Sequence, residues 1–150
     1  MAAVKLIIGA DHAGFARKET LLRELIDDGN EVIDVGAQQY EKSDDYPDFA
    51  AAVAQAVVAE EGARGIIICG SGVGASIAAN KFKGARACLC HDIYSAIQGV
   101  EHDDMNIMCL GGLIVGPALA RKLVAGFLSA EFLAGGRYLR RLNKVIALES

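Results

Sequence analysis

The sequence predicts a three-layer α/β fold in which helices cover both faces of a parallel sheet. Short apolar runs rich in β-branched residues alternate with longer helical patterns along the whole chain. Most of these runs contain few polar residues, which is typical of strands that are buried on both faces. Such an alternation of strands and helices implies right-handed crossovers and a doubly wound, Rossmann-like sheet. With five parallel strands we expect the order 2-1-3-4-5, followed by a C-terminal helix.

Each element has a local signal. The first helix carries an apolar stripe that includes Leu21 and Leu25, and Gly29 marks its end. Pro47 suits the first turn of the second helix. In chain order, the predicted elements are a strand at Val4–Ala10, a helix at Phe15–Asp28, a strand at Glu31–Val35, a helix from Asp45 to about Glu61, a strand at Gly65–Cys69, a short helix at Ala75–Lys81, a strand at Ala85–Cys90, a helix at Asp92–Val100, a strand at Asn106–Leu110, and helices at Gly116–Ala130 and Arg137–Leu148. Because no repeat or linker interrupts this pattern, we expect residues 1–150 to form one domain.

Composition excludes several classes of partner. The formal net charge of −4 argues against a nucleic-acid partner, which needs a basic surface. No segment approaches the roughly 20 apolar residues of a membrane helix, so we expect no membrane partner. The first apolar run reaches Asp11 too soon for a signal peptide, which predicts a cytoplasmic protein. Its four cysteines are then expected to be free thiols, and their spacing does not suggest zinc.

Polar residues follow the first and third predicted strands directly. Asp11 and His12 come after the first strand, and Cys69, Gly70 and Ser71 end or follow the third. In the predicted order, these two strands flank the topological switch point, where ligands bind beyond the carboxyl ends. Two polar clusters that are far apart in sequence are therefore expected on one crevice.

Cys69 is the first candidate for chemistry. It ends an apolar run, and Gly70, Gly72 and Gly74 follow it at every second position before a helical segment begins. Bare backbone N–H groups at a helix N-terminus suit an anion, and a thiol beside them is a competent base or nucleophile. The structural alternative, a buried inert cysteine, is favoured for the other three cysteines.

Four further side chains are candidates for binding, each with a structural alternative. His102 precedes the fifth strand, in another carboxyl-end loop if the preceding helix returns there, and it is equally interpreted as a satisfied polar residue. Tyr46 could bind a substrate hydroxyl, or it could be a half-buried ring. Arg137 and Arg141 share a helix face and suit a phosphate or carboxylate, although a solvated face has the same pattern.

Two motifs offer competing interpretations. Residues 70–75 fit the dinucleotide pattern GxGxxA, with Asp92 as the downstream acid, so a noncatalytic nucleotide- or phosphate-binding module is an alternative. The pattern lies on the third strand, however, and only half of the chain remains to complete such a fold. A Cys-x5-Arg phosphatase loop would need arginine at position 75, which is Ala75.

Taken together, the motifs resemble the RpiB/LacAB family of sugar-phosphate isomerases, and within it most closely the type B ribose-5-phosphate isomerases. The resemblance covers nearly the whole chain through GADHAG at 9–14, DYPDFA at 45–50, GIIICGSGVGASIAANK at 65–81, EHDDMN at 101–106 and GGRYLRR at 135–141. It implies interconversion of ribose 5-phosphate and ribulose 5-phosphate, without a metal or organic cofactor. It also implies a homodimer or dimer of dimers whose active sites are shared between subunits.

The resemblance also implies roles for individual residues. Cys69 would carry a proton between C1 and C2 of the sugar through an enediol, while the N–H groups of the glycine loop stabilise the developing oxyanion. Ser71 and His102 would open the sugar ring. The remaining implied contacts are those of Asp11, Tyr46 and Asp103 near the ring hydroxyls, and those of His12, Arg137 and Arg141 with the phosphate.

The chain departs from the family pattern at two positions. Leu113 stands where ribose-5-phosphate enzymes usually have an arginine, and Tyr138 stands where a histidine is usual. Another branch of the family uses a glutamate base at the position of Ala75, so Cys69 and Ala75 together indicate the cysteine branch. The loss of one guanidinium leaves galactose 6-phosphate, allose 6-phosphate or a tetrose phosphate as alternative substrates.

Overall fold

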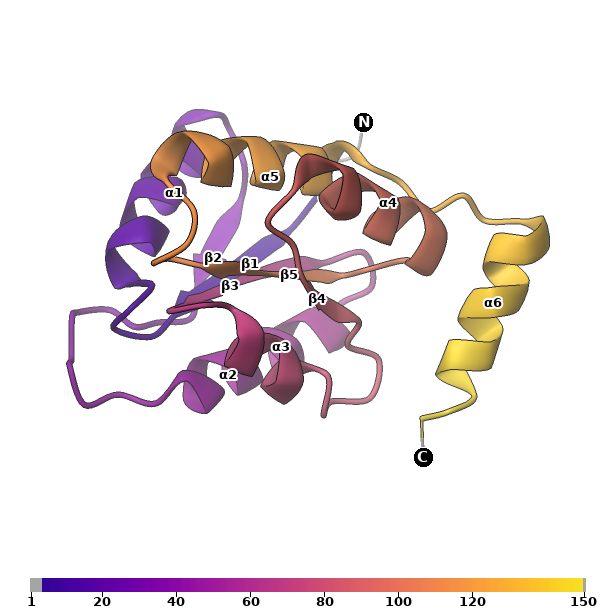
Figure 1. The fold of residues 1–150 in the computed structure, drawn as a ribbon, viewed down its shortest axis with the longest axis horizontal. Helices are drawn as coiled ribbons and strands as arrows, with labels where there is room; N and C mark the ends of the chain where they lie inside the picture. The colour runs from indigo at the N-terminus through magenta and orange to yellow at the C-terminus, as the bar shows by residue number, and fades with distance from the viewer. Residues whose placement is uncertain (1–3, 150) are drawn as a thin grey trace.

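The computed structural model describes residues 4–149 and confirms the doubly wound α/β fold. Figure 1 shows α1, α4 and α5 on one face of the sheet, α2 and α3 on the other, and α6 set apart beyond the sheet on the side of α4. No helix within the described residues is long and apolar enough to cross a membrane. The elements are β1 (Leu6–Ala10), α1 (Phe15–Asp27), β2 (Val32–Asp34), α2 (Tyr46–Val58), β3 (Arg64–Cys69), α3 (Val73–Ala79), β4 (Ala87–Leu89), α4 (Ile93–Asp103), β5 (Ile107–Gly111), α5 (Pro117–Ser129) and α6 (Gly136–Ile146).

The strand order is β2-β1-β3-β5-β4, so the predicted order 2-1-3-4-5 was wrong for its last two strands. All five residues of β5 are buried, whereas β4 has three residues and an exposed central one, which suits an edge. The chain passes from β3 through α3 to the edge and then returns through α4 to insert β5. The connection from β4 to β5 runs back towards β3, opposite to the direction of the connection from β3 to β4. A right-handed crossover therefore requires α4 on the face opposite α3, where it packs against α5.

The switch point between β1 and β3 is as predicted. Strand β1 pairs in parallel with both β2 and β3, and its last residue, Ala10, is level with Ile68. On the other side of β3, Cys69 is level with Gly111 at the end of β5. The register therefore brings Asp11, Cys69 and Gly111 into one row at the carboxyl edge of the sheet.

Two apolar layers hold the sheet between its helices. Side chains alternate along the central strands, so Ile66 and Ile68 pack towards α1, α4 and α5, while Ile67 and Cys69 pack towards α2 and α3. The Cys69 side chain is only 5% exposed and shares its layer with Ala75 of α3. The pleat of β3 thus aims the thiol at the first turn of the helix that follows it.

Helix α6 buries fewer residues against the rest of the chain than the other helices do. Leu142 is its one buried residue. Along the same helix and just beyond it, several large apolar side chains are exposed, namely Leu139, Val145, Ile146 and Leu148. The face of α6 that would ordinarily join a core is therefore largely uncovered within one chain.

Candidate active site

Three loops meet at the carboxyl edge of the sheet. The backbone N–H of Asp11 donates to Ile68 O, and the N–H of Gly112 donates to Cys69 O at 2.7 Å. Gly14 makes the approach of the β1–α1 loop possible, because a Cβ there would lie 2.2 Å from Ile68 O. The ends of β1, β3 and β5 are thereby fastened to one another by backbone bonds, which gives the site a rigid floor.

The thiol of Cys69 faces the N-terminus of α3. The N–H of Gly72 donates to Cys69 Sγ at 3.2 Å, and the N–H of Val73 donates to Ser71 Oγ at 3.3 Å. Gly72 has a φ of 83° and is the N-cap residue directly before α3. The Cys69 sulfur therefore accepts a backbone N–H at the point where α3 begins. Ser71 is exposed and available to a ligand.

Tyr46 lies against the glycine loop. A Cβ on Gly74 would be 2.5 Å from Tyr46 Cζ, so the missing side chain is what admits the ring. In a dinucleotide site, the glycine loop must stay bare so that the pyrophosphate can approach the backbone. The tyrosine occupies that approach, which argues against the nucleotide-binding alternative and brings Tyr46 to within reach of the Cys69 loop.

Asp11 is buried beside the thiol loop. Its Oδ1 accepts N–H bonds from Ala13 at 3.0 Å and from Gly14 at 3.1 Å. Burial raises the pKa of the Asp11 carboxyl above its ordinary value, while these two bonds and His12 oppose the rise. The carboxyl group is therefore fixed in place, and burial makes it easier to protonate than a free aspartate.

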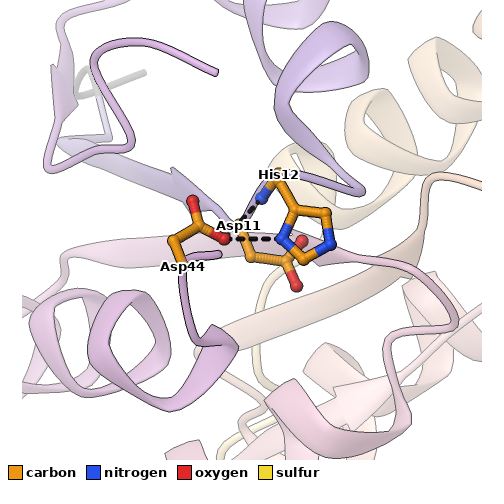
Figure 2. A group of neighbouring side chains, drawn as sticks. All are labelled: Asp11, His12 and Asp44. Carbon is orange, nitrogen blue, oxygen red and sulfur yellow. Dashed lines mark hydrogen bonds and ion pairs between the residues drawn. The ribbon is translucent and has the colours of Figure 1, made fainter. Parts of the chain in front are cut away.

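His12 forms a close pair with Asp44, which was absent from the sequence-based candidates. Figure 2 shows the imidazole facing the carboxylate, with Nδ1 2.7 Å from Asp44 Oδ1; the same oxygen accepts the His12 backbone N–H at 2.9 Å. The hydrogen bond to Asp44 is the main cause that raises the pKa of His12 above its ordinary value. The Asp11 carboxylate offers an oxygen within 4.8 Å of the pair. Because Nδ1 is already engaged at hydrogen-bond distance, the arrangement is that of a carboxylate–imidazole pair.

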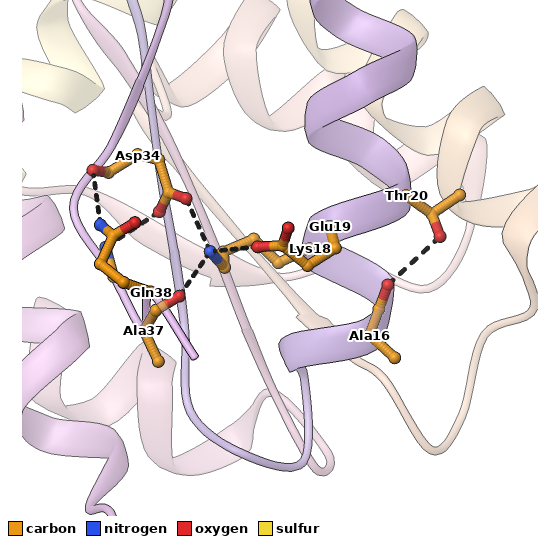
Figure 3. Close-up of polar contacts among 8 residues, drawn as sticks. Ala16, Lys18, Glu19, Thr20, Asp34, Ala37 and Gln38 are labelled. Carbon is orange, nitrogen blue, oxygen red and sulfur yellow. Dashed lines mark hydrogen bonds and ion pairs between the residues drawn. The ribbon is translucent and has the colours of Figure 1, made fainter. Parts of the chain in front are cut away.

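The loop that carries Asp44 and Tyr46 is anchored by a buried lysine. Figure 3 shows Lys18 of α1 reaching across to the end of β2, where its Nζ donates to Asp34 Oδ2 at 2.8 Å and to Ala37 O at 2.7 Å. Glu19 supplies a third acceptor at 2.9 Å. Lys18 is fully buried, so its ammonium group depends on these partners and holds the start of the loop to the body of the protein.

The other predicted site residues lie elsewhere in the chain. The His102 ring stacks on Tyr138 with centroids 4.5 Å apart, and Arg137 Nη2 donates to the Tyr138 hydroxyl at 3.0 Å. Asp103 follows His102 at the end of α4, and Arg141 is exposed one turn along α6 from Arg137. We call His102, Asp103, Arg137, Tyr138 and Arg141 the α4–α6 cluster.

The expectation that His102 lies in a carboxyl-end loop was wrong within one chain. Helix α4 returns from the carboxyl edge to the amino end of β5, so its last turn lies at the opposite end of the sheet from Cys69. The neighbouring Asp104 confirms this position, because it pairs with Arg86 at the amino end of β4. The structure therefore brings together Asp11, His12, Tyr46, Cys69, the glycine loop and Ser71, but keeps the α4–α6 cluster apart from them.

His91 and Leu113 complete the surroundings of the thiol. The N–H of Gly111 donates to His91 Nε2 at 3.0 Å, so that nitrogen acts as an acceptor that ties the end of β4 to β5. Leu113 is 78% exposed, and a Cβ on Gly70 would lie 3.6 Å from its Cδ1. An apolar side chain thus stands at the mouth of the site, where the resemblance leads one to expect a cation.

Fold and site together define a doubly wound α/β protein whose thiol and carboxyl group lie at the topological switch point beside a glycine loop. The chain belongs to the ribose/galactose isomerase family, whose model matches residues 6–145. It is 43% identical to ribose-5-phosphate isomerase B of Escherichia coli, over 97% of this chain and 96% of that protein. It is 40% identical to D-erythrulose-4-phosphate isomerase 2 of Mycolicibacterium smegmatis, over 98% of both chains.

A solved structure is similarly close over its whole length. Ribose-5-phosphate isomerase B of Mycoplasma genitalium, with bound ribulose 5-phosphate, superposes with a TM-score of 0.93. It is 37% identical, and the match covers 99% of this chain and 98% of that one. These matches confirm the family resemblance drawn from the motifs.

Proposed function

We propose that this protein is an aldose–ketose isomerase that interconverts ribose 5-phosphate and ribulose 5-phosphate. The observation that carries the proposal is the thiol of Cys69, held at the switch point against the N–H of Gly72 in a chain that matches ribose-5-phosphate isomerases over nearly its full length. A base beside preorganised N–H donors is what proton transfer next to a carbonyl group requires.

In the proposed reaction, the Cys69 thiolate removes the proton from C2 of the open-chain aldose. The electron pair of that C–H bond forms the C1=C2 double bond, and the carbonyl electrons move onto O1 to give an enediolate. The O2 proton passes to O1 and the thiol returns its own proton to C1, so atoms and charge balance. The glycine loop Gly70–Gly74 supplies N–H donors for the enediolate, with Gly72 committed to the sulfur.

Ring opening and orientation are assigned to the polar groups around the thiol. Ser71 and His102 act on the ring oxygen and its hydroxyl, and Asp11, Tyr46 and Asp103 bind the hydroxyls of the sugar. Support for Asp11 and Tyr46 comes from their positions around the Cys69 loop. His12, Arg137 and Arg141 bind the phosphate, since a charged imidazole and two guanidinium groups suit a dianion.

We further propose a homodimer, or a dimer of dimers, in which each site is shared. The α4–α6 cluster lies at the opposite end of the sheet from Cys69, so a second copy must supply it. Both regions have exposed apolar residues to bury: Leu139, Val145 and Leu148 on or beside α6, and Leu113 and Ile114 beside the site. Mutual burial of such surfaces is the main source of stability in obligate dimers.

The function is tested with Cys69→Ala. We expect conversion of ribose 5-phosphate to fall by about 10²–10⁴-fold, the usual contribution of a general base. Cys88→Ala is the matched control, because it removes an exposed thiol from the edge strand and should turn over like the wild type. A chelator should leave both rates unchanged. Equal turnover in Cys69→Ala and the wild type would contradict the assigned base.

The substrate is tested with a panel of aldose phosphates, because Leu113 favours a second candidate. An apolar residue at the mouth of the site removes one cation, and one relative is named as an isomerase of a four-carbon phosphosugar. We expect the largest kcat/KM with ribose 5-phosphate. A larger value with a tetrose phosphate, galactose 6-phosphate or allose 6-phosphate would replace the substrate while retaining the reaction.

We place the protein in the cytoplasm, where its free thiols would stay reduced.

A further inference from the structure

We propose that Asp44 is a positioning residue for phosphate binding: it fixes the His12 ring and keeps it cationic, with Nε2 turned towards the substrate. The proposal rests on the phosphate role given to His12 above. Asp44 touches neither the thiol loop nor the reacting carbons in the proposed mechanism, and both of its hydrogen bonds go to His12, so its main effect would pass through His12.

The geometry supports a fixed ring. One oxygen of Asp44 accepts both the backbone N–H of His12 at 2.9 Å and the ring Nδ1–H at 2.7 Å. Two bonds from a single residue fix the backbone and the side-chain torsions together. Figure 2 shows the second ring nitrogen on the side away from the carboxylate, where it is free to donate to a ligand.

The burial of Asp44 argues against a purely structural role. Its side chain is only 11% exposed, and its Oδ2 is buried without a hydrogen-bond partner among the described residues. A buried carboxylate oxygen without a partner lowers stability, so the fold gains little from keeping an aspartate here. The negative charge of Asp44 is compensated by His12, and it therefore stabilises the protonated His12 ring.

The charges around His12 act in the same direction. Asp11 faces the ring from the end of β1, and Asp44 and Tyr40 face it from the β2–α2 loop, with Tyr40 edge-on at 6.3 Å. The hydrogen bond that the His12 ring donates to Asp44 is the largest cause that raises the pKa of His12, and the charges of Asp11 and Asp44 add to it. In the proposed dimer, Arg137 and Arg141 of a second copy would oppose this effect. One further titratable side chain, the Cys69 thiol, lies at the end of the adjacent strand β3.

The pH window shows why the pair matters. A sugar phosphate becomes a dianion above about pH 6, whereas a free histidine loses its charge near pH 6.5. An unassisted histidine would therefore bind the dianion as a cation over a very narrow range. A raised pKa keeps the ring charged as pH rises, so attraction to the dianion is retained to higher pH and is lost only above the folded pKa.

The first test is an NMR titration of the ring resonances, which is tractable because the chain has three histidines. We expect His12 to titrate above pH 6.5 in the wild type and at lower pH in Asp44→Asn. Asparagine keeps an oxygen that can accept the backbone N–H, so the loop should persist while the charge is lost. Asp48→Asn, an exposed change of equal charge on α2, should leave the His12 midpoint in place.

The titration requires no turnover, so it tests the pair even if ribose 5-phosphate is not the substrate. A wild-type His12 midpoint at or below pH 6.5 overturns the proposal, whether or not the variant folds. An unchanged midpoint in folded Asp44→Asn overturns it as well.

The second test uses steady-state kinetics on the preferred substrate of the panel. For Asp44→Asn we expect KM to rise about ten-fold at pH 8, with kcat little changed and KM near the wild-type value at pH 6. In a His12→Gln background, Asp44→Asn should add little further loss, since its effect passes through the ring. A fall in kcat with constant KM, or equal losses at both pH values, would overturn the positioning role. Failure of every sugar phosphate to react would count against the proposed function alone.

Discussion

Gly72 sets the geometry of the thiol at the scale of a single residue. Its φ of 83° lies in the left-handed region, and it directs its own N–H at Cys69 Sγ. A Cβ at this position would lie 2.6 Å from Leu89 Cδ1 and 2.9 Å from the carbonyl carbon of Leu110. The residue is therefore required both for its backbone conformation and for lack of space.

Gly72→Ala is expected to lower the free energy of unfolding by about 2–4 kcal/mol, from left-handed strain and overpacking together. Gly29→Ala is the matched control, because its φ is also positive, at 91°, but a Cβ there meets nothing within 4 Å. It should cost only about 1 kcal/mol. Urea denaturation of the two variants compares them directly, and equal losses would show that packing at Gly72 contributes nothing.

The sequence predicted the candidate-site residues that directly follow strands, and Tyr46 at the start of a helix, but it did not predict Asp44. Asp11, His12 and Cys69 could be predicted because the carboxyl ends of neighbouring parallel strands share an edge. Asp44 lies in the aperiodic segment between β2 and α2, and its partner is 32 residues away. Only the folded loop brings the two together, although the adjacent acids Asp44 and Asp45 were a local hint.

At the scale of the element, Lys18 connects helix α1 to the loop that carries Asp44 and Tyr46. Its ammonium group is fully buried among Glu19, Asp34 and Ala37 O. Because those acceptors surround one cation, removing it leaves the Asp34 carboxylate largely buried without its partner. The loop and the helix are thus coupled through a single side chain.

Lys18→Met should lower the free energy of unfolding by about 3 kcal/mol, the usual cost of removing one member of a buried ion pair. Thermal or urea unfolding monitored by circular dichroism would measure it. Lys122→Met on α5 removes an exposed amine and should cost less than about 0.5 kcal/mol. If both variants unfold alike, the buried amine is not the anchor that its contacts suggest.

The strand order shows what periodicity alone can specify. The apolar runs identified five strands and their alternation with helices, which was enough for the fold class. They did not specify which neighbour each strand selects, because β4 and β5 both contain apolar residues and cysteine. The deciding signals were the brevity of β4 and its exposed central residue, Cys88, both of which depend on tertiary packing.

At the scale of the whole molecule, the two halves of the proposed site lie at opposite ends of the sheet within one chain. His102 was expected near Cys69 because it lies in a loop before a strand. It instead lies in the last turn of α4, which ends at the amino edge of the sheet. A residue that directly precedes a parallel strand lies at the amino end of that strand, so the position of His102 before β5 already pointed away from the Cys69 edge. In the proposed dimer, this separation would leave a single chain without a complete site.

Subunit complementation tests this arrangement. Co-expressed Cys69→Ala and Arg137→Ala chains should form heterodimers in which one of the two sites has both native residues. Random pairing then predicts about one quarter of the wild-type activity from two variants that are each impaired. Cys69→Ala mixed with Asp11→Asn is the control. Both changes lie at the carboxyl edge of the sheet, in the same half of the proposed site, so no intact site can form. Absence of recovery in the first mixture would place both groups within one chain.

The order β3-β5-β4 also has a consequence during synthesis. Strand β4 pairs only with β5 in the described sheet, and β5 fills the space between β4 and β3. As the chain leaves the ribosome from its N-terminus, β4 emerges without a partner, and β3 keeps an open edge until residues 107–111 follow. The last strand to be made, β5, is an interior strand, so the sheet is completed late in translation. A chain stopped before β5 would expose the unpaired edges of β3 and β4 to aggregation.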